Sequence, residues 1–207
     1  MSRVARVVLA TRNAHKVEEL NAILSEVVGE LHLEVVGVTE FPEVEDVVES
    51  GVTFAENATL KAVQVCQATG MPSLADDSGL AVDVLGGCPG VFSARWSGVQ
   101  GPDKDRANNQ LLLSQLGDVP DAHRAAAFVC AAVLAMPDGT VRVQEGRVSG
   151  RLGRAPRGSG GFGYDPLLIV DGGERTLAEF SPAEKNAISH RGKAFRALAA
   201  DLRELLA

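Results

Sequence analysis

A glycine-rich segment constrains this chain more than any other feature of its sequence. Residues 158–166 read GSGGFGYDP, with four glycines in six positions, although the whole chain holds only seven Phe, one Tyr and one Trp. Glycine loses the most backbone freedom on folding, so such a cluster indicates positive φ angles or backbone amides brought close to a ligand. Phe162, Tyr164 and Asp165 add flat rings and an acceptor, which would suit a base and its sugar. The alternative is a flexible surface loop.

Length and composition are those of a globular protein. The 207 residues can form one large domain or two closely packed lobes, and 45% of them are hydrophobic. No apolar run is long enough to span a membrane. The opening MSRVARVVLATRN has too short an apolar stretch for a signal peptide, so we interpret it as a first strand. We therefore predict a cytoplasmic protein.

Cysteine usage and charge exclude several other classes. Cys66, Cys88 and Cys130 are far apart and form no C-x-x-C pair, which argues against a disulfide framework or a zinc site. The net charge of −7 argues against a nucleic acid lying across the general surface. Any phosphate ligand must therefore meet a local cluster of cations.

Hydrophobic periodicity predicts an α/β fold with a mixed sheet. A capping box at Thr53–Glu56 and another at Ser181–Glu184 each predict the start of a helix, and Pro137-Asp138-Gly139 predicts the turn of a hairpin. We expect strands at 4–10, 34–38, 73–75, 125–136, 141–143 and 167–170, and helices at about 17–27, 54–68, 103–116, from 182, and from about 193.

Acidic side chains offer a metal site. Asp76 and Asp77 end a predicted strand, where alternation allows only one of the two to face a given cleft. With Glu49 from an acidic loop, such a carboxylate can hold Mg²⁺ and orient or deprotonate a water molecule. Taken alone, Asp-Asp-Ser-Gly is also a good turn sequence.

Cations lie in three other segments. The TRNAHK loop at residues 11–16 precedes a predicted helix, where an anion is favoured, although Thr-x-Asn is equally good capping chemistry. Lys61 lies on the same predicted helix as Glu56 and Asn57. His190 and Arg191, between two predicted helices, could donate to the edge of a base.

Together these segments resemble the inosine triphosphate pyrophosphatase family, of the Ham1 type, over nearly the whole chain. The matching motifs, in order, are Thr11-x-Asn13-x-x-Lys16, Glu49-Ser-Gly51-x-Thr53-Phe54-x-Glu56-Asn57-Ala58-x-x-Lys61-Ala62, ADDSGLAVDVLGGCPGVFSARWSG from Ala75, GGFGYDP from Gly160 and EKNAISHRG from Glu184. The resemblance implies a single domain, residues 1–207, with a long curved mixed sheet and flanking helices that form two lobes around a central cleft. It also implies a homodimer.

The resemblance further implies hydrolysis of noncanonical purine nucleoside triphosphates (ITP, dITP, XTP) to the monophosphate and pyrophosphate. Asp77 and Lys16 would be catalytic, and Asp77 and Glu49 would bind Mg²⁺. The implied substrate-binding residues are Thr11, Arg12, Asn13, Ala14, His15, Lys16, Lys61, Ser78, Phe162, Gly163, Tyr164, Asp165, Lys185, His190 and Arg191.

Two other functions remain open at this point. A non-catalytic nucleotide-binding module would need the phosphate and base loops but not the acidic cluster, so the carboxylates favour an enzyme. A Maf-type nucleotide pyrophosphatase would act on other nucleotides, whereas the aromatic-glycine loop and the His-Arg pair favour purines.

Overall fold

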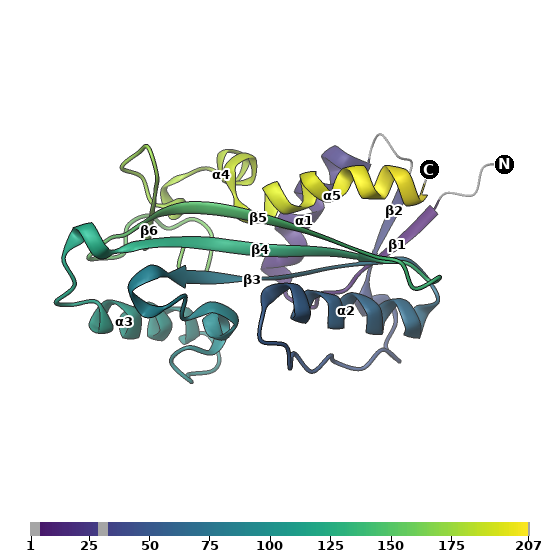
Figure 1. Cartoon of the computed structure of the whole chain (residues 1–207), viewed down its shortest axis with the longest axis horizontal. Coiled ribbons are helices and arrows are strands. Elements are labelled where there is room, and N and C mark those ends of the chain that lie inside the picture. The colour runs from purple at the N-terminus through teal and green to yellow at the C-terminus, as the bar shows by residue number, and fades with distance from the viewer. Residues whose placement is uncertain (1–4, 29–32, 207) are drawn as a thin grey trace. The chain divides into compact units, whose positions relative to one another are not determined.

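The computed structural model describes residues 5–28 and 33–206 and contains one six-stranded sheet with α-helices around it (Figure 1). None of the helices within these ranges is both long and apolar enough to cross a membrane. The strands are β1 (Ala5–Leu9), β2 (Leu33–Gly37), β3 (Ser73–Val82), β4 (Ala125–Ala135), β5 (Val141–Leu152) and β6 (Leu168–Val170). The helices are α1 (Ala14–Val28), α2 (Phe54–Thr69), α3 (Lys104–Gln115), α4 (Pro182–Ile188) and α5 (His190–Leu206).

The sheet is mixed, as the sequence predicts. Its strand order is β2-β1-β3-β4-β5-β6, with β1 parallel to β2 and β3, and β5 antiparallel to β6. The predicted hairpin joins β4 to β5, and the amide of Met136 donates to the carbonyl of Thr140 across its turn, at 2.8 Å. The α/β fold class is therefore confirmed.

The chain divides into two compact units. Unit 1 comprises Met1–Asp77, Cys130–Gly146 and His190–Ala207, and unit 2 comprises Ser78–Val129 and Arg147–Ser189. Strands β3, β4 and β5 each contribute residues to both units. That the chain is one domain of two lobes around a cleft stays a prediction, and each unit is described below by itself.

Unit 1 has two hydrophobic layers, one on each face of its part of the sheet. Along β4, Cys130, Ala132 and Leu134 belong to the layer that contains the buried side chains of α1 and α5. The alternate residues of the same strand, Ala131 and Val133, belong to the layer that contains those of α2. Figure 1 shows α1 and α5 on one face and α2 on the other. The side chains alternate because successive strand residues point to opposite faces.

Unit 2 has a single core, which includes Leu112 and Leu116 of α3. The fully buried Arg124 ties the end of this helix to the end of β5. Its guanidinium donates to the carbonyl oxygens of Leu116 at 2.6 Å, Leu152 at 2.9 Å and Gly153 at 2.8 Å. A buried guanidinium is stable only when its donors are satisfied in this way. These bonds fix the point from which the chain enters the glycine-rich segment.

Several predicted element boundaries are wrong. Strand β5, expected at 141–143, continues to Leu152, and helix α1 begins at Ala14 rather than near residue 17. Strand β3 does not end at the aspartates but continues to Val82, because Leu80 and Val82 alternate into the core. Gly79 is part of this strand, and a Cβ there would lie 2.4 Å from Ser93 Oγ, so glycine permits close packing rather than a turn. Helix α5 begins at His190, three residues earlier than expected.

Candidate functional site

Asp76 lies at the centre of a charge cluster in unit 1. One of its oxygens, Oδ2, accepts from Lys16 Nζ at 2.9 Å and from Arg191 Nε at 3.2 Å. Arg191 also donates through Nη1 to Glu19 of α1. Helices α1 and α5 thus each direct a cation at the same carboxylate of β3.

The cations determine the protonation state of Asp76. Burial alone would raise the pKa of this carboxyl, but Lys16, Arg191 and Lys61 outweigh burial and hold the pKa well below its usual range. Burial alone would lower the pKa of the Arg191 guanidinium, but the carboxylates of Asp76 and Glu19 outweigh it and raise that pKa. Burial, reinforced by the Asp76 carboxylate, raises the pKa of the Cys130 thiol. Asp76 is therefore an anion held by cations, which makes it a poor proton acceptor.

Asp77 has different partners because it is the next residue of the same strand. Its Oδ1 accepts from Lys61 Nζ at 3.3 Å, and its Oδ2 accepts from Asn57 Nδ2 at 3.3 Å. Lys61 also donates to Glu49 Oε1 at 2.9 Å. All of these partners come from α2 or the loop before it. Strand alternation thus separates the two aspartates, as the sequence predicts.

The pKa values of Asp77 and Lys61 are both raised. For Asp77, burial is the main cause; Lys61 and Lys16 oppose it, while Glu49 and Asp76 reinforce it. For Lys61, burial alone would lower the pKa, but the carboxylates of Asp77, Asp76 and Glu49 outweigh it. Lys61 therefore keeps its proton, while Asp77 is a stronger base than an exposed aspartate.

The carboxylates of Asp77 and Glu49 suit a hard divalent cation. Both contact the ammonium group of Lys61, so their oxygens converge on one positive charge. Mg²⁺ typically takes one or two carboxylates and completes its shell with water and substrate phosphates. Among the described residues, no group of three or more His, Cys, Asp or Glu side chains forms a ready-made metal site. The two carboxylates therefore fit Mg²⁺ only when the substrate or water supplies the other ligands.

The loop before α1 uses its polar residues mainly for local structure. The side chain of Asn13 accepts from the amide of Lys16 at 3.4 Å, and Thr11 Oγ1 accepts from the amide of Asn13 at 3.3 Å. Arg12 contacts Asp46 at 2.8 Å and the carbonyl of Val44 at 2.6 Å. Ala14 and His15 begin α1, and their side chains lie outside the described part of the structure. Capping is therefore present, and phosphate binding by this loop stays a prediction.

In unit 2, the glycine-rich segment encloses a buried ion pair. Lys185 Nζ donates to Asp165 Oδ2 at 2.6 Å, and the same oxygen accepts from the amide of Phe162 at 2.9 Å. The Lys185 ammonium lies 5.1 Å from the centre of the Phe162 ring, within the range of a cation–π interaction. Gly161 has φ +70°, and a Cβ there would lie 2.0 Å from Asp165 Oδ2. Glycine is required at this position both for its backbone conformation and for space.

Helix α4 carries the lysine of this pair, and a capping box fixes where the helix starts. The Ser181 hydroxyl accepts from the amide of Glu184 at 3.3 Å, and the Glu184 carboxylate accepts from the amide of Ser181 at 2.9 Å. Lys185 follows directly and is 5% exposed. The sequence predicts this helix start correctly. Lys185 lies within the helix rather than between helices as expected, and its contact with substrate stays a prediction.

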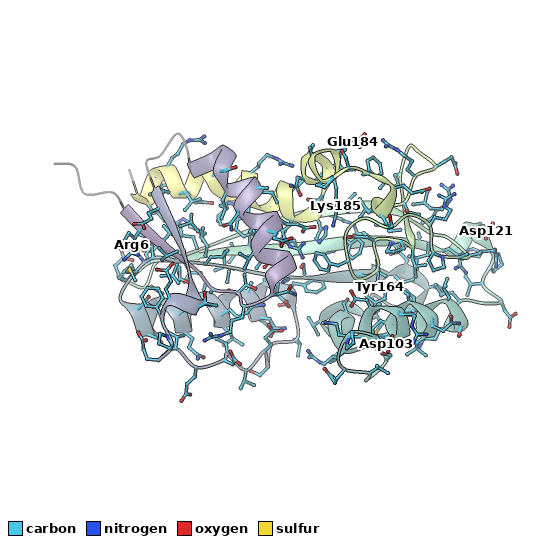
Figure 2. The ribbon with its side chains drawn as sticks, turned by 180° about the vertical axis from the view of Figure 1, so that it is seen from behind. Arg6, Asp103, Asp121, Tyr164, Glu184 and Lys185 are labelled. Atoms are coloured by element: carbon cyan, nitrogen blue, oxygen red, sulfur yellow. The ribbon has the colours of Figure 1, made fainter. Side chains whose placement is uncertain are left out.

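Tyr164 is part of the core of unit 2. Its side chain packs with Leu112 and Leu116, and its hydroxyl donates to the carbonyl of Ser93 at 2.9 Å. Figure 2 shows Tyr164 beside α3 and Lys185 above it. Burial, reinforced by the nearby Asp105 carboxylate, raises the pKa of the phenol. Tyr164 thus supports the segment from inside, while contact with a nucleoside stays a prediction.

The remaining predicted residues are also located. His190 and Arg191 lie in the first turn of α5, not between helices as expected, and both are buried. Ser78 follows Asp77 within β3. Whether these three side chains contact substrate stays a prediction.

Sequence reasoning assigned no role to four residues that the structure brings to these clusters. Glu19 lies three residues after Lys16 on α1, and Asn57 lies four residues before Lys61 on α2. Residues three or four apart share one face of a helix, which is the signal that could have identified both. In unit 2, Asp105 and Asn109 of α3 contact Gly163.

Known proteins resemble this chain along nearly all of its length. A model of the Ham1 family matches residues 7–201. A Streptomyces avermitilis protein named dITP/XTP pyrophosphatase is 60% identical over 203 residues, which cover 98% of this chain and 100% of that protein. The solved structure of a HAM1 protein from Coxiella burnetii has a TM-score of 0.86 at 41% identity, covering 97% of this chain and 100% of that one. A crystal structure of a nucleoside-triphosphatase, dITP/XTP pyrophosphatase, from Mycobacterium abscessus has a TM-score of 0.77 at 49% identity, covering 95% and 98%.

Proposed function

The chain belongs to the Ham1 family, and on that basis we propose that it hydrolyses noncanonical purine nucleoside triphosphates to the monophosphate and pyrophosphate. Relatives that share about half or more of its residues are named dITP/XTP pyrophosphatases, which supports dITP, XTP and ITP as substrates. The products would be those of cleavage between the α and β phosphates.

The observation that carries this proposal is the pairing of lysines and carboxylates in unit 1. Lys16 lies against Asp76, and Lys61 lies against both Asp77 and Glu49. Phosphoanhydride hydrolysis needs little covalent help from a protein; it needs positioning and positive charge on the phosphoryl oxygens. The two lysines supply that charge, and Asp77 supplies a base.

We assign the proton transfer to Asp77. Lys61 and Asn57 each donate to one of its oxygens, which holds the carboxylate in place to accept a proton from water. Lys16 would neutralise charge on the phosphates, with residues 11–15 beside it. Mg²⁺ bound by Asp77 and Glu49 would add further positive charge at the phosphates.

For base selection we propose His190, Arg191 and the segment around Phe162. A 6-oxo purine accepts from such donors, whereas a 6-amino group leaves each buried donor unpaired at about 1–3 kcal/mol. Two such donors, at about 2–6 kcal/mol together, correspond to a preference for ITP over ATP of at least about thirtyfold in kcat/KM. Arg191→Ala tests the assignment. A narrower ITP-to-ATP ratio would support it. Equal losses on both substrates would limit Arg191 to its contacts with Asp76 and Glu19 and refute its role in base selection.

A panel of nucleoside triphosphates, with pyrophosphate and orthophosphate measured separately, tests the function. We expect pyrophosphate as the first product, with ITP, dITP and XTP as the best substrates. Orthophosphate as the first product would refute the proposed bond. A preference for pyrimidine or modified nucleotides would favour a Maf-type enzyme, and binding without turnover would favour a non-catalytic module.

We also propose Mg²⁺ as the cofactor, a homodimer as the assembly and the cytoplasm as the location. The metal is tested by chelation followed by addition of Mg²⁺, which should restore turnover. Light scattering of the purified protein tests the dimer, and a mass of about one chain would refute it.

A further inference from the structure

The peptide groups on both sides of Gly163 are held by one helix of unit 2. The amide of Gly163 donates to Asp105 Oδ2 at 2.8 Å, and its carbonyl accepts from Asn109 Nδ2 at 2.9 Å. Asp105 and Asn109 are four residues apart on α3, so they lie on the same face, one turn apart.

These two bonds fall on the backbone between the two neighbouring aromatic residues. The amide belongs to the peptide that joins Phe162 to Gly163, and the carbonyl belongs to the peptide that joins Gly163 to Tyr164. Gly163 has φ +62°, in the left-handed region that glycine enters without strain. Glycine by itself leaves the backbone free to adopt many conformations. Asp105 and Asn109 therefore restrict the backbone conformation at Gly163.

Beside these two bonds the helix and the segment leave a space between them, although the Tyr164 side chain of the same segment packs with Leu112 and Leu116 of the helix. A cavity of about 330 Å³ lies between them, lined by Asp105, Asn109, Gly163 and Phe162 among others. The polar contacts therefore bridge a gap that apolar side chains leave unfilled.

Asn109 has a buried polar atom that is unfavourable for the stability of the folded protein. It is 8% exposed, and its Oδ1 has no hydrogen-bond partner within the described part of the chain. A buried acceptor left in this way is unfavourable, and an apolar side chain would avoid the penalty. The contribution that distinguishes asparagine here is the bond from its Nδ2 to Gly163.

We propose that Asp105 and Asn109 are positioning residues, which fix Phe162 in the orientation that receives the purine base. On the opposite side, the Phe162 amide is already held by Asp165, which pairs with Lys185. The ion pair thus holds the backbone at Phe162, and the helix holds the backbone at Gly163, the next residue. This inference rests on the proposed function, because it assigns the role of Phe162 in substrate binding.

Steady-state kinetics with ITP test the role. Asp105→Ala should raise KM about tenfold and change kcat less than about threefold, because it loosens binding of the nucleoside and leaves the unit 1 residues intact. Asp105→Asn keeps an acceptor in the same place and should return KM to within about threefold of the wild type. Asn109→Ala should raise KM similarly while the melting temperature stays close to that of the wild type, since the orphaned acceptor is removed too.

Asp103→Ala is the matched control. Asp103 precedes α3, makes no capping bond with its side chain, and pairs with exposed Arg106 rather than with Gly163. Figure 2 shows it at the start of the helix that passes Tyr164. This variant should keep the wild-type KM and kcat.

Amide hydrogen exchange at Gly163 provides a readout that does not depend on activity. Exchange should accelerate at least about tenfold in Asp105→Ala and stay unchanged in Asp103→Ala. A wild-type KM with unchanged exchange in Asp105→Ala would overturn the inference, as would a loss confined to kcat. If the wild type fails to cleave ITP, the proposed function falls, while the exchange experiment still decides whether α3 constrains Gly163.

Discussion

The polar cluster of unit 1 and the glycine-rich segment of unit 2 are stabilised in different ways. Around Asp76, the cluster takes Lys16 and Glu19 from α1 and Arg191 from α5, which are far apart in the sequence, and each contact joins opposite charges. Around Gly163, the chain is held through its own backbone amide and carbonyl by side chains of one helix.

The difference shows which perturbations each region should tolerate. A charge cluster in a buried setting is sensitive to the loss of one member, because the remaining charge loses its partner. A backbone held by hydrogen bonds is sensitive to geometry, and a conservative substitution that keeps the acceptor preserves it. The following experiments are ordered from the largest expected effect to the smallest.

Asp77→Asn should reduce turnover of ITP at least about a hundredfold, because it removes the base and a metal ligand while keeping the side-chain shape. The measurement is kcat at saturating substrate, with folding checked by circular dichroism. Asp83→Asn, at an exposed position just beyond β3, is the control and should be unaffected. If the folded variant kept near-normal turnover, the catalytic role would move elsewhere, with Glu49 as the first candidate.

Asp76→Asn should lower the free energy of unfolding by about 3 kcal/mol at neutral pH, since it leaves buried Lys16 and Arg191 without their shared anion. Asp77→Asn should leave that free energy equal or higher, because it removes a charge that burial disfavours. Urea unfolding without added metal measures both. If both variants lowered the free energy of unfolding, or both raised it, the result would contradict the opposite pKa shifts of the two aspartates.

The pH dependence of these two effects also differs in sign. The pKa of Asp76 is lowered on folding, so its stabilising contribution is present above the unfolded value of about 3.9 and is lost only in stronger acid. The pKa of Asp77 is raised, so its penalty is complete above the folded pKa and disappears as the pH falls below the unfolded value. The Asp77→Asn difference should therefore vanish in mild acid, while the Asp76→Asn difference should persist.

Tyr164 should ionise at a higher pH in the folded protein than in urea, where a tyrosine titrates near pH 10. Burial and the Asp105 carboxylate raise its pKa, so the protonated phenol stabilises the folded protein. This stabilisation is complete below the pKa of the unfolded protein and is lost as the pH rises through the pKa of the folded protein. Phenolate absorbance follows this residue alone, because the chain has one tyrosine. Asp105→Ala should reduce the difference between the folded and unfolded pKa of Tyr164, and Asp103→Ala should leave that difference unchanged. Equal titration in both states would contradict the buried position of the ring.

The rate of cysteine alkylation should differ between the two units, and this is the smallest effect that we expect. Cys66 and Cys130 in unit 1 are buried with raised thiol pKa values, whereas Cys88 in unit 2 is partly exposed. Because the thiolate is the reactive form, we expect one thiol to be alkylated quickly under native conditions and two only after unfolding. Cys88→Ser should remove the fast phase, and mass spectrometry identifies the modified residue.

The sequence was sufficient for features that depend on local order. The capping box at Ser181–Glu184 predicts helix α4, and alternation predicts that Asp76 and Asp77 point to opposite faces. The order of short motifs identified the family, which the comparisons confirm. The helix cap and the strand alternation are each complete within a few residues, whereas the order of the motifs extends from Thr11 to Gly192.

Tertiary packing decided what those residues do once the chain has folded. Asp-Asp-Ser-Gly is a turn sequence by composition, yet β3 runs through it because Leu80 and Val82 enter the core. Arg191 lies against Asp76, 115 residues away, and Gly163 lies against Asp105, 58 residues away. Contacts at such separations depend on the burial of distant apolar surface, which no local pattern encodes. The sequence therefore determined which chemical groups the protein has, and packing determined which of them form ion pairs and hydrogen bonds with one another.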